Sequence, residues 1–261
     1  MNKDDQVTVL GVKLSVISNK DLLGFIDFRL KKKNKFIIST PNPEIILLAQ
    51  RNLELMRALN EADVALPDGI GVVMANLILN RKKAIHRIPG RQAMLDLFSY
   101  ANDKRLKVFL LGAQKKVNKD AVALLISKYP NVIVKGSSGA HFDSNMHYRT
   151  NRDSLIDSKS IQMINDFQPD LLFVAFGAPK QEIWLLRNLG TLKIGGAMVV
   201  GGSLDSFTGN IPNPPGWVSA VGIEWLWRLL NQPSRFFRTI NALIVFPLVV
   251  LKERLVNYTG K

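Results

Sequence analysis

The chain has 261 residues, a mass of 29.2 kDa and no cysteine, so it can form a large domain plus an appendage but no disulfide or Cys-ligated metal site. Its three histidines are scattered, without the spacing of a metal site. Basic residues outnumber acidic ones by 35 to 21, and this net charge of +14 predicts an anionic partner such as nucleic acid, a membrane surface or a phosphate-bearing substrate.

Short apolar runs typical of buried strands alternate along the chain with segments of helical apolar spacing. The runs lie near residues 36–40, 62–66, 107–112, 131–136, 170–177 and 197–202. Strand-like stretches also occur in residues 7–18, and helical spacing is clearest in residues 43–60 and 119–130. Continuous apolar strands separated by helices predict an α/β domain with a mostly parallel sheet and helices on both faces.

Polar side chains follow two of these runs at the point where each predicted strand ends. TPNPE (40–44) follows the run FIIS, and LPDGIG (66–71) ends the run DVAL. In open α/β sheets, ligands bind at the carboxyl ends of parallel strands. We therefore expect Thr40, Asn42 and Asp68 to lie together in an active site.

Asp68 is the main candidate for a catalytic base. It follows Pro67 and precedes two glycines, in a tight loop whose backbone a ligand can approach. The alternative is that Asp68 caps the next helix, a position where aspartate is favoured. The expected convergence with Thr40 and Asn42 favours the catalytic interpretation.

Arg87 and Arg91 belong to the segment HRIPGRQAM (86–94), which joins two predicted helices. A guanidinium group binds phosphate oxygens through two parallel hydrogen bonds, so either arginine could hold a phosphate. Both arginines are equally compatible with solvated loop positions, and His86 with an ordinary surface histidine.

The segment GAPKQE (177–182) opens a predicted helix after a buried strand. The free amide groups at the start of that helix, with Gly177, Lys180 and Gln181, suit a phosphate or the edge of a nucleoside. Neither this segment nor LLGAQKK (110–116) matches the dinucleotide or P-loop fingerprints. Asp205, in the loop GGSLDSFTG, is a lesser acid candidate that could simply brace its loop.

The composition changes near Gly209. A proline-rich connector, NIPNPPGW (210–217), separates an expected catalytic domain of residues 1–209 from an appendage of residues 210–261. The apolar run 242–251 is shorter than the ~20 residues that a membrane-spanning helix needs. Arginine and tryptophan beside this run predict a tail on the membrane interface, or a helical hairpin packed on the domain, and both can hold together.

Taken in order, these motifs resemble those of the WecG/TagA/CpsF family of bacterial glycosyltransferases. The similarity covers about residues 36–238 through TPNPEIILLAQRNLELMRALNEADVALPDGIGVV, HRIPG, VFLLGA, GAPKQEIW, GGSLDSFTG and GIEWLWRLLNQPSRFFR. The resemblance implies a Rossmann-like domain with a C-terminal helical, membrane-docking appendage. It also implies an inverting transferase that uses a UDP-sugar and requires no metal or other cofactor.

Family members typically transfer N-acetylmannosamine, or its uronic acid, to undecaprenyl-diphosphate-linked N-acetylglucosamine. The resemblance therefore implies cell-surface polysaccharide or teichoic acid synthesis at the inner face of the plasma membrane. The charged start MNKDDQ lacks the apolar stretch of a secretory signal, which agrees with a cytoplasmic location. The sequence is compatible with a homo-oligomer, and it contains no recognised nucleic-acid-binding module.

By motif, Asp68 corresponds to the base of the family, and Thr40 and Asn42 correspond to polar active-site positions. Substrate-contacting positions of the family fall on two residues of the domain and three of the appendage: Arg87, Gln181, Arg228, Arg235 and Arg238. The three appendage arginines are implied to reach the diphosphate of the acceptor.

The sequence departs from the family in Asn213-Pro214-Pro215, where Arg-Ala-Pro is usual, and in Arg91-Gln92, where a small or acidic pair is expected. The first departure affects the hinge before the appendage and one phosphate contact that the resemblance implies. The second departure affects the sugar specificity that the resemblance implies. Three alternatives stay open: a glucosyltransferase for another exopolysaccharide lipid intermediate, a non-catalytic sugar-nucleotide binder on the membrane, and a nucleic-acid-binding protein, which only the net charge favours.

Overall fold

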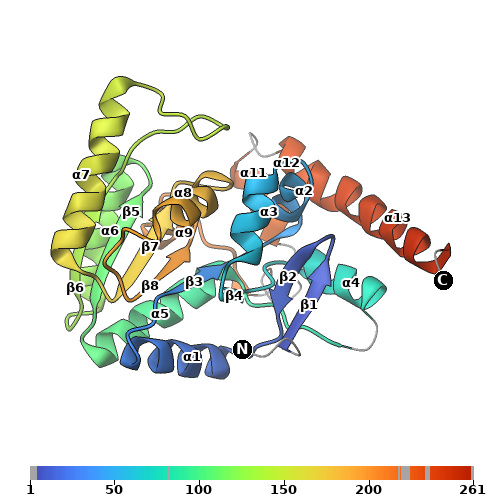
Figure 1. Ribbon diagram of the computed structural model, residues 1–261, viewed down its shortest axis with the longest axis horizontal. Coiled ribbons are helices and arrows are strands. Elements are labelled where there is room, and N and C mark those ends of the chain that lie inside the picture. Colours follow the sequence, from blue (N-terminus) through green and yellow to red (C-terminus); the bar gives the residue numbers. More distant parts are fainter. Residues whose placement is uncertain (1–4, 81–82, 217, 219–223, 233–235, 260–261) are drawn as a thin grey trace.

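A parallel sheet of six strands forms the centre of the computed structural model, which describes residues 5–80, 83–216, 218, 224–232 and 236–259 (Figure 1). The strand order is β4-β3-β8-β7-β5-β6, and every pairing is parallel. The strands are β3 (Phe36–Ser39), β4 (Val64–Ala65), β5 (Lys107–Gly112), β6 (Ile133–Ser137), β7 (Leu171–Ala175) and β8 (Gly196–Val199). The prediction of a mostly parallel sheet is confirmed.

The direction of the chain across the sheet changes beside β3. The chain passes from β3 to β4 at one edge, whereas the other neighbour of β3 is β8, the last strand in the sequence. Loops that leave the carboxyl ends of β3 and β8 therefore diverge, and a crevice at such a point is where α/β sheets bind ligands.

Helices cover both faces of the sheet (Figure 1). One face packs against α1 (Asn19–Lys31), α5 (Gly90–Lys104), α6 (Lys115–Lys128) and α9 (Ser203–Phe207). The opposite face packs against α2 (Pro43–Ala49), α3 (Leu53–Asn60), α4 (Ile70–Leu79), α7 (Asn151–Phe167) and α8 (Lys180–Asn188). Buried aromatic residues anchor both layers: Phe98 lies 4.9 Å from Phe173 between ring centroids, and Trp184 is buried on the opposite face.

The strand-like residues near the N-terminus form a separate antiparallel hairpin, β1 (Gln6–Val9) and β2 (Val12–Ser15). Its turn residues, Leu10 and Gly11, both have positive φ, as a tight two-residue hairpin turn requires. The Ala65 amide donates to the Ser15 hydroxyl over 3.0 Å, which ties the hairpin to β4.

The single helical pattern of residues 43–60 becomes two helices, α2 and α3. The break occurs where Asn52 accepts a hydrogen bond from the Leu55 amide at 2.9 Å and so caps α3. Asparagine is favoured at such caps because its side chain satisfies an amide that has no partner within the helix.

The C-terminal segment is helical and packs on the domain. It comprises α11 (Glu224–Asn231), α12 (Phe236–Ile240), the π-helical turn η3 (Asn241–Val245) and α13 (Phe246–Thr259). Phe246 and Val250 are each 1% exposed and join the same apolar cluster as the sheet. No helix in the described part of the chain is long and apolar enough to cross a membrane. The connector before it, residues 210–215, has no regular structure, as its prolines predict.

Asn118 of α6 fixes the carboxyl ends of two strands. Its buried Nδ2 atom lies 3.0 Å from the Leu110 carbonyl oxygen, 2.9 Å from that of Gly112 and 3.1 Å from that of Ser137. Replacing this amide with a methyl group leaves buried carbonyl groups of β5 and β6 without a donor.

We expect Asn118→Ala to lower the free energy of unfolding by about 1–3 kcal/mol, because unmet buried polar groups are costly. Urea denaturation followed by circular dichroism measures this change. Asn151→Ala, at an exposed residue that begins α7, is the matched control. Equal effects of the two substitutions would contradict a role for Asn118 in joining the strand ends.

Candidate active site

The loops after β3 and β4 are joined by backbone hydrogen bonds that extend the strand pairing. The Leu66 amide donates to the Ser39 carbonyl over 2.8 Å, and the Asp68 amide donates to the Pro41 carbonyl over 3.1 Å. Asp68 is therefore held beside the loop that carries Thr40 and Asn42, as the sequence predicts.

The segment HRIPG (86–90) completes this group of loops. The amide of Ile88, next to Arg87, donates to the carbonyl of Pro67, next to Asp68, over 3.0 Å. A Cβ atom added to Gly90 would lie 2.9 Å from Thr40 Cγ2, so the start of α5 closely approaches the end of β3. The structure thus brings Thr40, Asp68 and Arg87 to one edge of the sheet.

Asp68 is not the N-cap residue of the following helix. Gly69 occupies the N-cap position of α4, with a φ of +100°. The positive φ explains why a glycine follows Asp68, because other residues rarely adopt this conformation. The alternative prediction, that Asp68 is the N-cap residue of α4, is therefore wrong.

Asn42 has a structural role in addition to its place beside Asp68. Its Oδ1 atom accepts a hydrogen bond from the Ile45 amide at 2.9 Å and caps α2. The cap fixes the side chain at the start of the helix. The amide NH₂ of Asn42 could still donate a hydrogen bond to a ligand.

Gln181 joins the loops that follow β7 and β8. Its Oε1 atom accepts hydrogen bonds from the Gly177 amide at 3.1 Å and the Gly201 amide at 3.0 Å. Its Nε2 atom donates to Glu182 Oε1 over 2.9 Å, and the side chain is 2% exposed. In this structure Gln181 braces two strand-end loops, beside the pairing of β8 with β3.

Glu182 is a buried carboxyl group directly behind this brace. One oxygen accepts the hydrogen bond from Gln181, and the other has no hydrogen-bond partner among the described residues. Burial raises the pKa of Glu182 to about 7, because a carboxylate loses its hydration there.

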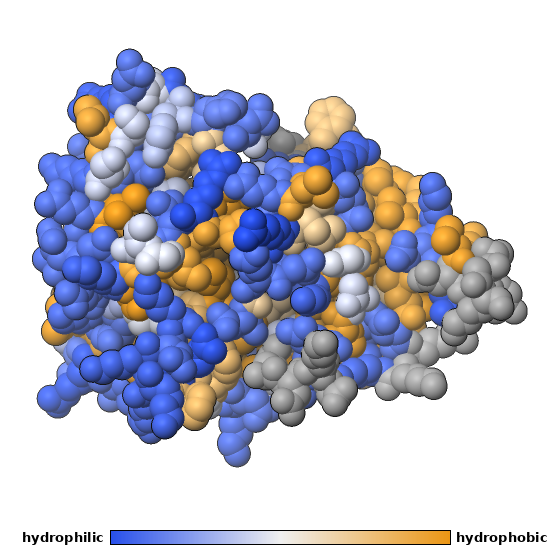
Figure 2. Space-filling model, viewed as in Figure 1, coloured by the Kyte–Doolittle hydropathy of each residue, from blue (hydrophilic) through white to orange (hydrophobic). Residues whose placement is uncertain are grey.

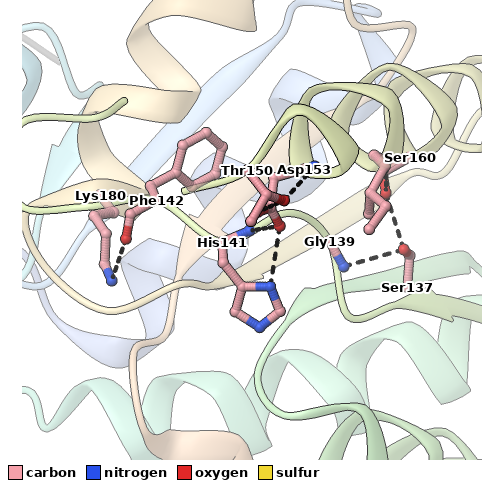
Figure 3. Close-up of polar contacts among 9 residues, drawn as sticks. Ser137, Gly139, His141, Phe142, Thr150, Asp153, Ser160 and Lys180 are labelled. Carbon is pink, nitrogen blue, oxygen red and sulfur yellow. Dashed lines mark hydrogen bonds and ion pairs between the residues drawn. The ribbon is translucent and has the colours of Figure 1, made fainter. Parts of the chain in front are cut away.

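The Lys180 side chain extends toward the connection between β6 and α7 (Figure 3). Its Nζ atom donates to the Phe142 carbonyl over 3.4 Å. Figure 3 also shows His141 and Thr150 converging on Asp153, which accepts from the His141 amide at 2.9 Å and from the Thr150 hydroxyl at 2.6 Å. The hydrogen bond from Thr150, followed by that from the His141 amide, lowers the pKa of Asp153 to about 2. Both bonds hold the connection between β6 and α7 in place.

Three cations from distant parts of the chain lie near the site. Burial, followed by the positive charges of Arg149 and Arg238, lowers the pKa of the Lys180 amine. Arg238 also approaches the site from the C-terminal segment, with its Nε atom 3.5 Å from Glu44 Oε1 in the first turn of α2. Lys180, Arg149 and Arg238 thus lie within electrostatic reach of one another, with the acidic Glu44 and Asp143 close by.

A hollow of about 570 Å³ opens at the carboxyl ends of β5 and β8. It is lined by Gln114, Lys116, Val117, Gly202, Asp205, Ser206, Asn210, Ile211 and Gln232. Its volume lies in the usual range for small-molecule sites. Burial raises the pKa of Asp205 in its wall. Asp68 is not among the lining residues, so the hollow and the group of loops around Asp68 are separate parts of the same edge.

Two predicted site residues cannot be placed. Arg235 lies outside the described residues, and the side chain of Arg228 is also outside them. The described part of the chain contains no group of three or more potential His, Asp or Glu metal ligands.

The structure also adds four residues that the sequence patterns did not single out: Arg149, Glu182, Gln114 and Lys116. Of these, Gln114 and Lys116 follow the carboxyl end of strand β5, and a position at a strand end could have identified them as candidate ligand contacts.

The chain is similar in sequence to a family of known transferases. Residues 7–260 match the model of the glycosyl transferase WecG/TagA/CpsF family. An N-acetylglucosaminyldiphosphoundecaprenol N-acetyl-beta-D-mannosaminyltransferase from Bacillus subtilis (strain 168) is 34% identical over 90% of this chain and 88% of its own length. An enzyme of the same name from Staphylococcus aureus (strain MRSA252) is 32% identical over 95% of this chain and 93% of its own length.

Glu182 makes the stability of the fold depend on pH. The pKa of Glu182 is raised in the folded state, so its protonated form contributes to the free energy of unfolding. This contribution is complete below the unfolded pKa near 4.5 and is lost as the pH rises through about 7. We expect the stability of the protein, relative to Glu182→Gln, to fall by roughly 3 kcal/mol at most over this interval. Chemical denaturation between pH 4.5 and 8 measures the difference, with exposed Glu253→Gln as control. A constant difference across the interval would show that Glu182 is ionised throughout.

Proposed function

The chain belongs to the WecG/TagA/CpsF family of glycosyl transferases, and we propose that it transfers N-acetylmannosamine from a UDP-sugar to undecaprenyl-diphosphate-linked N-acetylglucosamine. The observation that carries the proposal is the name shared by relatives that match nearly the whole chain. It favours N-acetylmannosamine over its uronic acid and over glucose as the transferred sugar. The product would be an intermediate of a cell-surface polymer.

The nucleotide of the donor would occupy the hollow at the ends of β5 and β8. The size of this hollow and its mixture of amide, carboxyl and amine groups suit a nucleoside diphosphate. The hollow lies at the same edge of the sheet as Asp68, so a bound donor would direct its sugar toward the loops after β3 and β4.

Asp68 would act as the general base in a single displacement with inversion. Its carboxylate would take the proton from the acceptor hydroxyl while that oxygen forms a bond to the anomeric carbon. The bond from this carbon to the UDP oxygen would break on the opposite face. Thr40 and Asn42, held beside Asp68, would orient the acceptor sugar, because their loops are joined by backbone hydrogen bonds.

Cations of the protein would stabilise the charge on the diphosphates. Arg87 is one candidate, because its segment is hydrogen-bonded to the loop of Asp68, and Arg149, Lys180 and Arg238 are further candidates. Fixed positive charge at a leaving group lowers the barrier because it requires no rearrangement during the reaction. Gln181 and Gly177 would support this geometry through the brace between their loops. Arg228 and Arg235 are proposed acceptor contacts on sequence grounds alone.

The C-terminal helices would hold the enzyme on the inner face of the membrane, where its lipid-linked acceptor lies. Apolar residues gather on the end of the molecule formed by α13 (Figure 2). Ile244, Leu248 and Leu251 are 56%, 60% and 49% exposed. Their spacing places Leu248 and Leu251 on the side of α13 opposite to buried Phe246 and Val250. Residues 210–261 would thus serve as a peripheral docking appendage.

We expect Asp68→Asn to reduce sugar transfer by about 10²–10⁴-fold, because the amide cannot accept the proton. Binding of UDP should remain nearly unchanged. Transfer is measured by chromatography of a short-chain lipid-diphosphate-N-acetylglucosamine acceptor, and binding by calorimetry. Asp103→Asn, at an exposed site on α5, is the matched control. Loss of UDP binding in parallel with transfer would indicate a structural role for Asp68.

We expect replacement of Ile244, Leu248 and Leu251 with serine to release the protein from anionic vesicles, because the exposed apolar side of the appendage is lost. These positions are better targets than truncation, which would also remove Phe246 and Val250 from the core. Serine at Leu53, Ile126 and Leu155, exposed on α3, α6 and α7, gives a control of equal size. Vesicle sedimentation is the measurement, and binding equal to that of the wild type would contradict docking through α13.

A further inference from the structure

A second hollow, of about 540 Å³, lies between the N-terminal hairpin, the end of α4 and α13. It is lined by Gln6, Val7, Thr8, Leu79, Asn80, Lys83 and Arg254. Two of these residues are basic, and none of the described residues that line it is acidic. It is separate from the active site, because Asp68 precedes the first turn of α4 and this hollow adjoins the last. The 10 residues of α4 span about 15 Å.

A buried polar network fixes the wall that carries Lys83. Asn76 is 0% exposed, and its Nδ2 atom donates to the Lys83 carbonyl over 2.7 Å. The Lys83 amide donates to the Asn80 carbonyl over 3.1 Å, and Asn80 Nδ2 donates to the Thr8 carbonyl over 2.7 Å. The backbone at Lys83 is therefore tied to both α4 and β1.

Arg254 reaches the same hollow from the packed side of α13. Phe246, Val250 and Arg254 recur at intervals of four residues, so they share one side of the helix. Phe246 and Val250 are buried against the domain, and Arg254 is half-buried where this side meets the hollow. Within the described residues, the side chains of Lys83 and Arg254 form no ion pair.

The two helices that reach this hollow, α4 and α13, also expose apolar side chains. Ile70, Met74 and Leu77 recur on one side of α4 with exposures of 45%, 56% and 53%. The neighbouring helix α13 exposes Leu248 and Leu251. Cations in a hollow beside exposed apolar helices match the chemistry of a phospholipid, whose anionic headgroup adjoins its acyl chains.

We propose that this hollow binds the phosphate headgroup of an anionic phospholipid, with Lys83 and Arg254 as its ligands and the exposed sides of α4 and α13 against the acyl chains. The proposal rests on the membrane association proposed above and deepens it, because it names a specific lipid contact. One bound headgroup would fix how the enzyme is oriented on the bilayer. Since α4 runs from the hollow to the loop of Asp68, it would also hold the active site at a set height above the membrane.

The test uses dihexanoylphosphatidylglycerol as a monomeric lipid, titrated into the full chain by calorimetry at constant ionic strength. We expect saturable binding of one lipid, weakened about tenfold or more in Lys83→Ser/Arg254→Ser. The double variant Lys119→Ser/Lys252→Ser removes the same charge from exposed positions on α6 and α13 and should bind as the wild type does. Binding of UDP, measured on the same samples, confirms that each variant is folded.

Equal weakening in both double variants would overturn the proposal, since it would reflect net charge alone. Inorganic phosphate that binds as tightly as the lipid would also overturn it, because the hollow would then be a site for free anions. The monomeric lipid separates this test from the proposed docking. Binding of the monomeric lipid without binding of vesicles would refute docking through α13 but not the lipid site. Binding of vesicles without binding of the monomeric lipid would refute only the lipid site.

Discussion

The backbone pairing of β3 with β4 continues past the strands into their loops, and the candidate active site depends on this continuation. Two amides beyond the ladder, those of Leu66 and Asp68, donate to carbonyls of the neighbouring loop. They hold the backbone of the Asp68 loop beside the loop that carries Thr40 and Asn42. A third hydrogen bond, from Ile88 to Pro67, adds an arginine-bearing segment to the same edge. Loops whose backbones are fixed before a substrate binds favour catalysis through orientation.

Basic side chains near this edge lie close together, whereas one acidic side chain, Glu182, is buried. The basic side chains of Arg149, Lys180 and Arg238 lie near one another, and burial, followed by the charges of the two arginines, lowers the pKa of Lys180. Behind them, Glu182 is buried beside Gln181 with a raised pKa, so near neutrality it adds less negative charge to the site than an exposed glutamate would. The brace that Gln181 forms between two loops is therefore compatible with a site that binds a diphosphate.

The sequence predicts the strands and most strand-end residues, but it does not predict the positions of the charged residues Arg149 and Glu182. Apolar runs identify all six strands of the sheet. The reason is clearest for the central strands, which are buried on both faces and need unbroken apolar residues, whereas the edge strand β6 is partly exposed. The places of Thr40 and Asp68 follow from the rule that strand ends meet at one edge. The cap formed by Asn42 was missed, although asparagine before Pro43 is a usual cap signal. Arg149 lies in an irregular connection, and only tertiary packing brings it to Lys180. Glu182 stands in the first turn of a helix, where an exposed acid is common, so its burial has no signature in the sequence.

The C-terminal helices combine two roles that the sequence leaves as alternatives. One side of α13 completes the core of the domain through Phe246 and Val250, and the other side exposes apolar residues. The central claim remains the transfer reaction, and the most direct measurement is UDP release from a panel of UDP-sugars with the lipid-diphosphate-N-acetylglucosamine acceptor. We expect acceptor-dependent release from UDP-N-acetylmannosamine and little from UDP-glucose. Release from UDP-glucose alone, or none from any donor despite measurable UDP binding, would contradict this claim.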